Sequence, residues 1–122
     1  MRLYEVTVTT EASGDAVAYA PSAGRARGRL ESIQYEKVDF ADGVDFTITD
    51  EETGESLWTD TNVNASEIVR PRAPVMDQAG AARLYADAGT AVSDKIAIVS
   101  RVKIVIAQGG NAKSGIFRFL VG

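Results

Sequence analysis

Residues 39–64 read DFADGVDFTITDEETGESLWTDTNVN, and this stretch decides the fold. Val44, Phe46 and Ile48 alternate with polar residues, so an extended chain would place three large apolar side chains on one face. An acidic turn follows, and it contains Gly54 where longer hairpin loops often require a positive φ. The stretch therefore predicts a β-hairpin that buries one face of its first arm.

The return arm of this hairpin begins with Leu57 and Trp58, which face opposite sides of an extended strand. One of the two is expected in the core together with the apolar side chains of the first arm, and we favour Leu57. The other is then buried against something else or exposed. Trp58 is accordingly a candidate exposed aromatic.

The same period of two recurs on both sides of the hairpin and predicts most of the remaining strands. The two N-terminal segments are separated by Ser13-Gly14-Asp15 and are expected to form a hairpin of their own. The uneven spacing of Leu30, Ile33 and Tyr35 indicates a β-bulge. The predicted strands outside the central hairpin cover 3–10, 16–20, 30–35, 95–100, 101–107 and 116–121.

Seven or eight strands with little helix predict an all-β fold, namely one antiparallel β-sandwich of jelly-roll type spanning residues 1–122. A partly closed barrel is the alternative. A chain of 122 residues is long enough to bury a single core without disulfides or metals.

The strand pattern stops in the long connection between residues 63 and 92, which contains two prolines and many small residues. A short helix around 78–87 is possible there. Connections of this length are uncommon in compact domains unless they dock on something, and both the protein's own sheet and a neighbouring subunit remain open. The residues expected at such an interface are Ile68, Val69, Arg70, Arg72, Val75, Met76, Leu84 and Tyr85.

Composition excludes several classes of function. Lys and Arg total 13 against 17 Asp and Glu, a formal charge of −4 that disfavours nucleic acid as a partner. The chain has neither histidine nor cysteine, so the usual catalytic base, thiolate nucleophile and transition-metal ligands are missing. We therefore predict no enzyme activity, no cofactor, no metal and no small-molecule substrate. No apolar run is long enough for a membrane span or a signal peptide, so no membrane association is expected.

Three motifs carry weaker signals. GGNAKSG at 109–115 resembles a phosphate-binding loop, but it leads into a strand where that loop opens a helix, so a hairpin turn is favoured. The acidic residues between 39 and 45 lack the ligand order of a calcium loop. Arg25, Arg27 and Arg29 form a basic stripe on alternate positions, which is either a solvated strand edge or a contact to an acidic surface on another subunit.

Four segments together resemble a family of short proteins encoded among the head genes of tailed bacteriophages. They are VDFTITDEETGESLWTDTNVNAS, RPRAP, ARLYADAGT and RVKIVIAQGGNAKSGIF, in that order within residues 44–117. The resemblance implies a virion structural protein that decorates or cements the outer surface of the capsid, commonly as a homotrimer, with the major capsid protein as its partner. It also implies a protein made in the host bacterial cytoplasm and located on the virion.

An alternative function belongs to a different class. β-Sandwiches with exposed aromatic side chains often present stacking platforms, so Trp58 and Tyr85 would suit a carbohydrate-binding or host-surface-binding module. The exposure of Trp58 distinguishes this alternative from the structural one.

Overall fold

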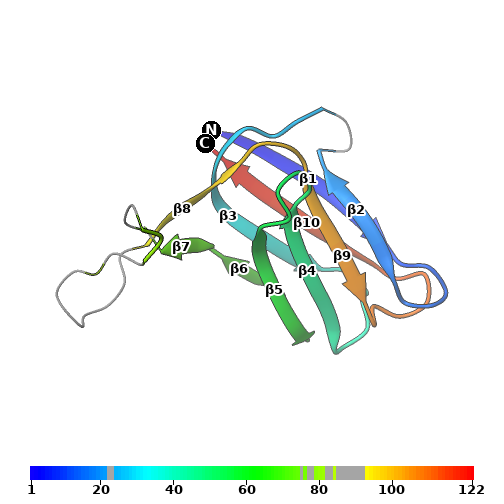
Figure 1. Cartoon of the computed structure of the whole chain (residues 1–122). Coiled ribbons are helices and arrows are strands. Elements are labelled where there is room, and N and C mark those ends of the chain that lie inside the picture. The colour runs from blue at the N-terminus through cyan, green and yellow to red at the C-terminus, as the bar shows by residue number, and fades with distance from the viewer. Residues whose placement is uncertain (22–23, 75, 77–78, 82–83, 85–92) are drawn as a thin grey trace.

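The computed structural model describes residues 1–21, 24–74, 76, 79–81, 84 and 93–122, and the account below concerns these residues. They form an all-β fold of antiparallel strands in two packed sheets (Figure 1), as the sequence predicts. The strands are β1 (Arg2–Thr9), β2 (Ala16–Ala20), β3 (Gly28–Lys37), β4 (Val44–Asp50), β5 (Ser56–Val63), β6 (Glu67–Val69), β7 (Arg72–Pro74), β8 (Ser93–Ile98), β9 (Val102–Ala107) and β10 (Ser114–Val121).

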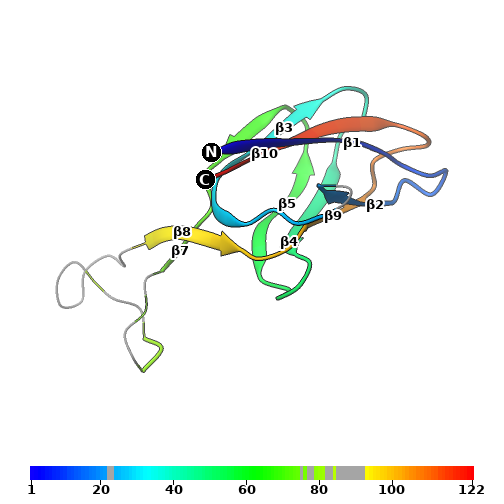
Figure 2. The ribbon, with the colours of Figure 1, turned by 90° about the horizontal axis from the view of Figure 1, so that it is seen from above.

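The strands are paired in a nested order. β1 pairs with β10, β2 with β9, β3 with β8, and β4 with β5. One sheet has the order β1-β10-β3-β8-β7, with β6 also on β3, and the other has the order β2-β9-β4-β5. This is the arrangement of a long hairpin wrapped into two sheets, which is a jelly roll. The central hairpin of β4 and β5 is the innermost pair, and the two termini of the described chain lie side by side (Figures 1 and 2).

The central hairpin buries its apolar face as predicted. Val44, Phe46, Ile48 and Leu57 are all buried, and Gly54 has a φ of 73° in the turn. A register shift between Ile48 and Thr49 adds one residue to β5. Because that bulge changes the alternation, Leu57 is buried while Trp58 still pairs with Ile48 and packs against the core.

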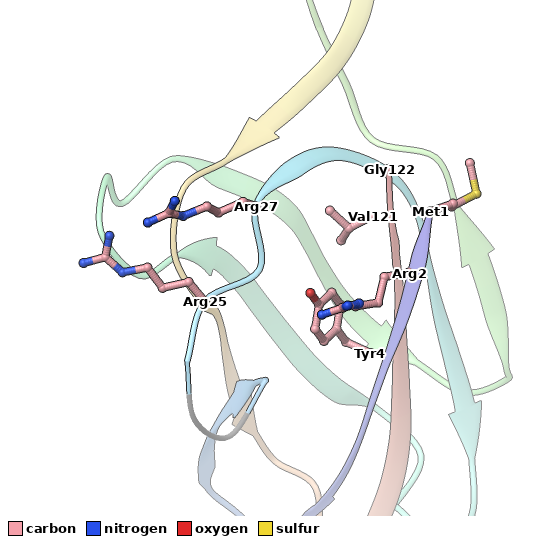
Figure 3. Close-up of a pocket in the computed structure, with 7 residues that line it drawn as sticks. All are labelled: Met1, Arg2, Tyr4, Arg25, Arg27, Val121 and Gly122. Carbon is pink, nitrogen blue, oxygen red and sulfur yellow. The ribbon is translucent and has the colours of Figure 1, made fainter.

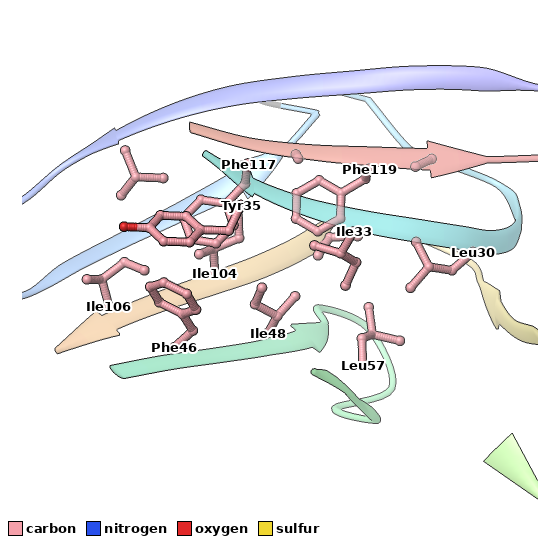
Figure 4. Close-up of a cluster of buried hydrophobic side chains, with 14 of the residues drawn as sticks. Leu30, Ile33, Tyr35, Phe46, Ile48, Leu57, Ile104, Ile106, Phe117 and Phe119 are labelled. Carbon is pink, nitrogen blue, oxygen red and sulfur yellow. The ribbon is translucent and has the colours of Figure 1, made fainter. Parts of the chain in front are cut away.

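The core lies between the two sheets and is centred on a cluster of aromatic rings (Figure 4). The ring of Phe46 on β4 lies 4.6 Å from that of Tyr35, 5.1 Å from that of Phe117 and 5.5 Å from that of Trp58, measured between centroids. Tyr35 and Phe117 come from β3 and β10 in the opposite sheet. Phe46 therefore joins the two layers at the centre of the molecule.

The hydroxyl of Tyr35 is buried without a hydrogen-bond partner among the described residues. An unsatisfied buried donor costs about 1–3 kcal/mol, so Tyr35→Phe is expected to stabilise the fold by about 1 kcal/mol at neutral pH. Chemical denaturation of the two proteins measures this difference. A clear loss of stability would contradict the prediction, because it would mean that the hydroxyl makes a favourable interaction.

The same substitution has a pH signature. Burial raises the pKa of Tyr35 to about 12 from its ordinary value of 10.0, so the folded state holds this proton more tightly than the unfolded state. Stability is therefore lost as the pH rises from 10 towards 12. Tyr35→Phe removes this contribution, and its advantage over the parent protein should grow between pH 9 and pH 11.

One local prediction is confirmed, one open alternative is decided and two predictions are wrong. The register of β10 on β3 shifts between Leu120 and Val121, which places the predicted bulge in β3. Around Ser100 and Arg101 the sequence left open a bend between two strands or an irregularity in one long strand, and the structure has a bend at Ser100 between β8 and β9. In contrast, β1 and β2 do not form a hairpin, and 109–115 is not a hairpin turn, because each connects strands that lie in different sheets. Each of these strands finds its partner far away in the sequence instead.

Candidate functional site

Strand β8 divides into two halves that lie in different surroundings. Ile96 to Ile98 pairs with the start of β3 and belongs to the sandwich. Ser93 to Lys95 pairs with β7 instead, and this short ribbon projects from the body of the molecule (Figures 1 and 2). We call the described residues between Arg70 and Lys95 the β-arm.

The β-arm is anchored at its base by polar contacts with β3. Lys95 Nζ lies 2.5 Å from Glu31 Oε1, and Arg29 Nη1 lies 3.5 Å from Asp94 Oδ2. Arg72 Nη1 donates a hydrogen bond of 3.2 Å to the carbonyl oxygen of Glu31. These contacts and the pairing of β8 with β3 hold the direction in which the arm leaves the sandwich.

β6 fills the part of the β3 edge that β8 leaves open. Its residues 67–69 pair with 33–35 of β3. Desolvation and a hydrogen bond with Asp60 on β5 raise the pKa of the Glu67 carboxyl. Glu67 thus contacts the edge strand of the other sheet, and the segment that leads to the β-arm lies across the border between the two sheets.

Several side chains predicted for an interface are exposed on β6 and on the β-arm. Ile68 is 58% exposed, Met76 is 61% exposed and Leu84 is 43% exposed. Arg70 is also exposed. Large apolar side chains exposed at such levels, next to cations and on a projecting element, are typical of a surface that contacts a partner.

Two of the predicted interface residues have other roles. Val69 pairs with the buried Ile33, and residues paired in this way point to the same face. Val69 is accordingly half-buried and packs against the core. Arg72 is exposed, but its guanidinium donates to the carbonyl oxygens of Glu31 and Pro71, so it stabilises the base of the β-arm.

Val75 and Tyr85, which complete the predicted interface, lie outside the described residues. The same is true of most of the predicted helix at 78–87. Its described residues, 79–81 and 84, are not helical.

Trp58 is not the exposed aromatic that the sequence suggested. It is half-buried, and its ring meets that of Phe46 at an interplanar angle of 66°. Its pairing with the buried Ile48 places it on the side of β5 that faces the core. The carbohydrate-binding alternative therefore lacks its platform at Trp58.

The acidic residues between 39 and 45 contact separate partners. Asp39 Oδ1 accepts a hydrogen bond of 2.5 Å from the Ser114 amide, which lowers the pKa of its carboxyl. Asp42 pairs with Lys37. Asp45 accepts from the Asn62 amide at 3.0 Å. Among the residues that the structure describes, no group of three or more acidic side chains is placed to hold a metal ion.

The basic stripe is divided. Ala26 is buried and donates its amide hydrogen to the Ser100 carbonyl oxygen, so Arg25 and Arg27 on either side of it are exposed. Arg29 pairs with Asp94. A residue that the sequence did not suggest, Arg2, joins Arg25 and Arg27 around a pocket near the chain ends. No local pattern connects residues 2 and 27, since only the pairing of β1 and β3 with β10 brings them together.

Comparisons with known proteins add no relative: no family model, curated protein or solved structure matches this chain. In the described part of the chain, no helix has the length and apolar character needed to cross a membrane. The candidate functional site therefore rests on the geometry of the β-arm.

Proposed function

We propose that this protein is a virion structural protein that decorates or cements the outer surface of a bacteriophage capsid, and that the β-arm contacts the shell or a neighbouring copy. The observation that carries the proposal is a projecting β-ribbon with exposed apolar side chains, anchored on a jelly-roll body. The resemblance of four segments to phage head proteins supports the same assignment.

The anchoring of the β-arm suits this role. A clamp between subunits acts by burying surface, and it loses less conformational entropy on binding when its direction is already held. Lys95 and Arg72 contact Glu31 on β3, and Asp94 contacts Arg29 on the same strand. These polar contacts provide that restraint. The exposed Met76 and Leu84 then lie on the part of the chain beyond this base, where a neighbouring surface can cover them.

Cosedimentation with empty capsid shells tests the proposal. The parent protein is expected to pellet with shells. The triple variant with Ile68→Thr on β6 and with Met76→Ser and Leu84→Ser on the β-arm is expected to bind at least about tenfold more weakly, because a few central side chains carry most of the binding energy of an interface and truncating one can cost about 2 kcal/mol. A protein that never pellets with shells would refute the capsid role.

The matched control is Val17→Thr. Val17 is 57% exposed, almost the same as Ile68, but it lies on β2 in the other sheet. It should leave shell binding within about twofold. Light scattering on the purified protein measures the expected homotrimer, and an equal loss of binding in the control would point away from the β-arm.

A further inference from the structure

A pocket of about 380 Å³ lies at the end of the sandwich where β1 begins and β10 ends. Its lining includes Arg2, Tyr4, Arg25 and Arg27, together with the last two residues of the chain. The side chains of Tyr4 and Val121 face the core, so the pocket lies at the edge of the core. Among the residues that the structure describes, no acidic side chain contributes to the lining.

The arginines of this pocket have no carboxylate partner of their own among the described residues. Within the described chain, none of Arg2, Arg25 and Arg27 forms an ion pair, and all of them are exposed. Five basic residues elsewhere in the described part of the chain do have carboxylate partners, as the bidentate contact of Arg101 with Glu51 at 2.6 and 2.7 Å shows. The paired basic residues are Arg29, Lys37, Lys95, Arg101 and Arg118.

The disposition of the arginines indicates the shape of the ligand. In Figure 3, Arg2 extends from β1 towards the segment that carries Arg25 and Arg27, whose own guanidinium groups extend onward in the same direction, away from Arg2. In this view the charges are thus spread out and do not converge on a single point. A spread of this kind suits an extended ligand with several negative groups better than one small anion.

The chemistry of the ligand follows from charge. Guanidinium groups bind carboxylate and phosphate oxygens in bidentate geometry. A nucleic acid would offer many phosphates, but the protein carries a net charge of −4 and would repel a long polyanion. A short acidic stretch of polypeptide offers the matching carboxylates with much less repulsion.

We propose that the pocket formed by Arg2, Arg25 and Arg27 binds an acidic segment of a partner protein through its carboxylates. The inference goes beyond the proposed function, because it assigns a second contact surface that does not include the β-arm. It also stands if the partner is not a capsid protein.

The test measures binding of a fluorescein-labelled hexaglutamate peptide by fluorescence anisotropy at low and high salt. The parent protein should bind, and salt should weaken the binding. The triple variant Arg2→Ala, Arg25→Ala and Arg27→Ala should bind about tenfold more weakly, as the sum of three exposed ion pairs predicts. The corresponding triple Arg→Lys variant should bind with an affinity between those of the parent protein and the alanine variant, because lysine keeps the charge but loses the bidentate geometry.

The matched control replaces Arg70, Lys103 and Lys113 with alanine, which removes the same charge from other surfaces. It should bind within about twofold of the parent protein. Equal weakening in both triple variants would overturn the proposal, because net charge alone would then explain the binding. Each single arginine variant is measured as well, with an expected loss of about twofold, so the result does not depend on one triple variant remaining folded.

Competition identifies the ligand class. Inorganic phosphate and a single-stranded oligothymidylate are added at matched concentrations of negative charge, and neither is expected to displace the peptide as well as unlabelled hexaglutamate does. Displacement by phosphate would show a small-anion site, and tighter binding of the oligonucleotide would show a nucleic-acid site. The absence of peptide binding, or either of these results, would overturn the proposal without affecting the shell-binding test of the β-arm.

Discussion

Phe46→Ala is expected to lower the free energy of unfolding by about 3–5 kcal/mol, which is a large part of the roughly 5–15 kcal/mol that holds a typical domain folded. Phe46 is buried, and its ring contacts those of Tyr35 and Phe117 from the opposite sheet and of Trp58 from the neighbouring strand. Alanine would leave a cavity between the sheets that rings attached to three different strands cannot easily close. Denaturant titration followed by Trp58 fluorescence measures the effect.

Thr47→Ala is the control for this substitution. Thr47 is the next residue of β4, and its side chain is exposed on the outer face of the same strand. It is expected to change stability by less than about 1 kcal/mol, through strand propensity only. If the two variants lost similar stability, the aromatic cluster would not be the centre of the core.

Asp50→Ala is the second substitution with a large expected effect, a loss of about 2–4 kcal/mol, because hydrogen bonds to a charged acceptor contribute about 1.5–3 kcal/mol each and some amides can rehydrate. Asp50 is buried at the start of the β4–β5 turn. Its Oδ1 accepts from the amides of Glu52 at 2.9 Å and Thr53 at 3.3 Å, and its Oδ2 accepts from the amide of Val99 at 3.2 Å. The side chain thus holds the turn and joins it to the β8–β9 connection.

Thermal unfolding compares this variant with Asp50→Asn and Glu52→Ala. Asparagine keeps one acceptor oxygen for the turn but presents a donor in place of the other oxygen, so an intermediate loss is expected. Glu52 is exposed in the same turn and should be nearly neutral when replaced by alanine. Equal stability of Asp50→Ala and Glu52→Ala would contradict the prediction, because it would show that the three hydrogen bonds of Asp50 contribute nothing to stability.

Local alternation was sufficient to predict the strands with one buried face. In β4, the buried Val44, Phe46 and Ile48 alternate with more exposed neighbours, and the same period appears in β10. The bulge in β3 was also visible, because an added residue leaves a gap in the spacing of apolar side chains. These features depend on side chains a few residues apart, which is the range that a sequence pattern covers.

Pairing between distant strands was not predictable in this way. β1 and β2 both have the pattern of hairpin arms, but β1 pairs with β10 and β2 with β9. β6 and β7 contain three residues each, too few for a period, and they form because β3 and β8 leave open edges. For the same reason the sequence identified the exposed Met76 and Leu84 but not the projection that carries them, nor the contribution of Arg2 to the pocket.

The nested order of the strand pairs sets how the chain can close its loops during folding. The β4–β5 pair needs only a short turn, and once it forms, β9 can be added next to β4 before the outermost pair of β1 and β10 closes nearly the whole chain. Forming the outermost pair first would have the highest entropic cost, because the closure cost grows with loop length. Folding from the centre outward divides that cost into smaller steps, although the many distant contacts still place this protein among the slower-folding topologies.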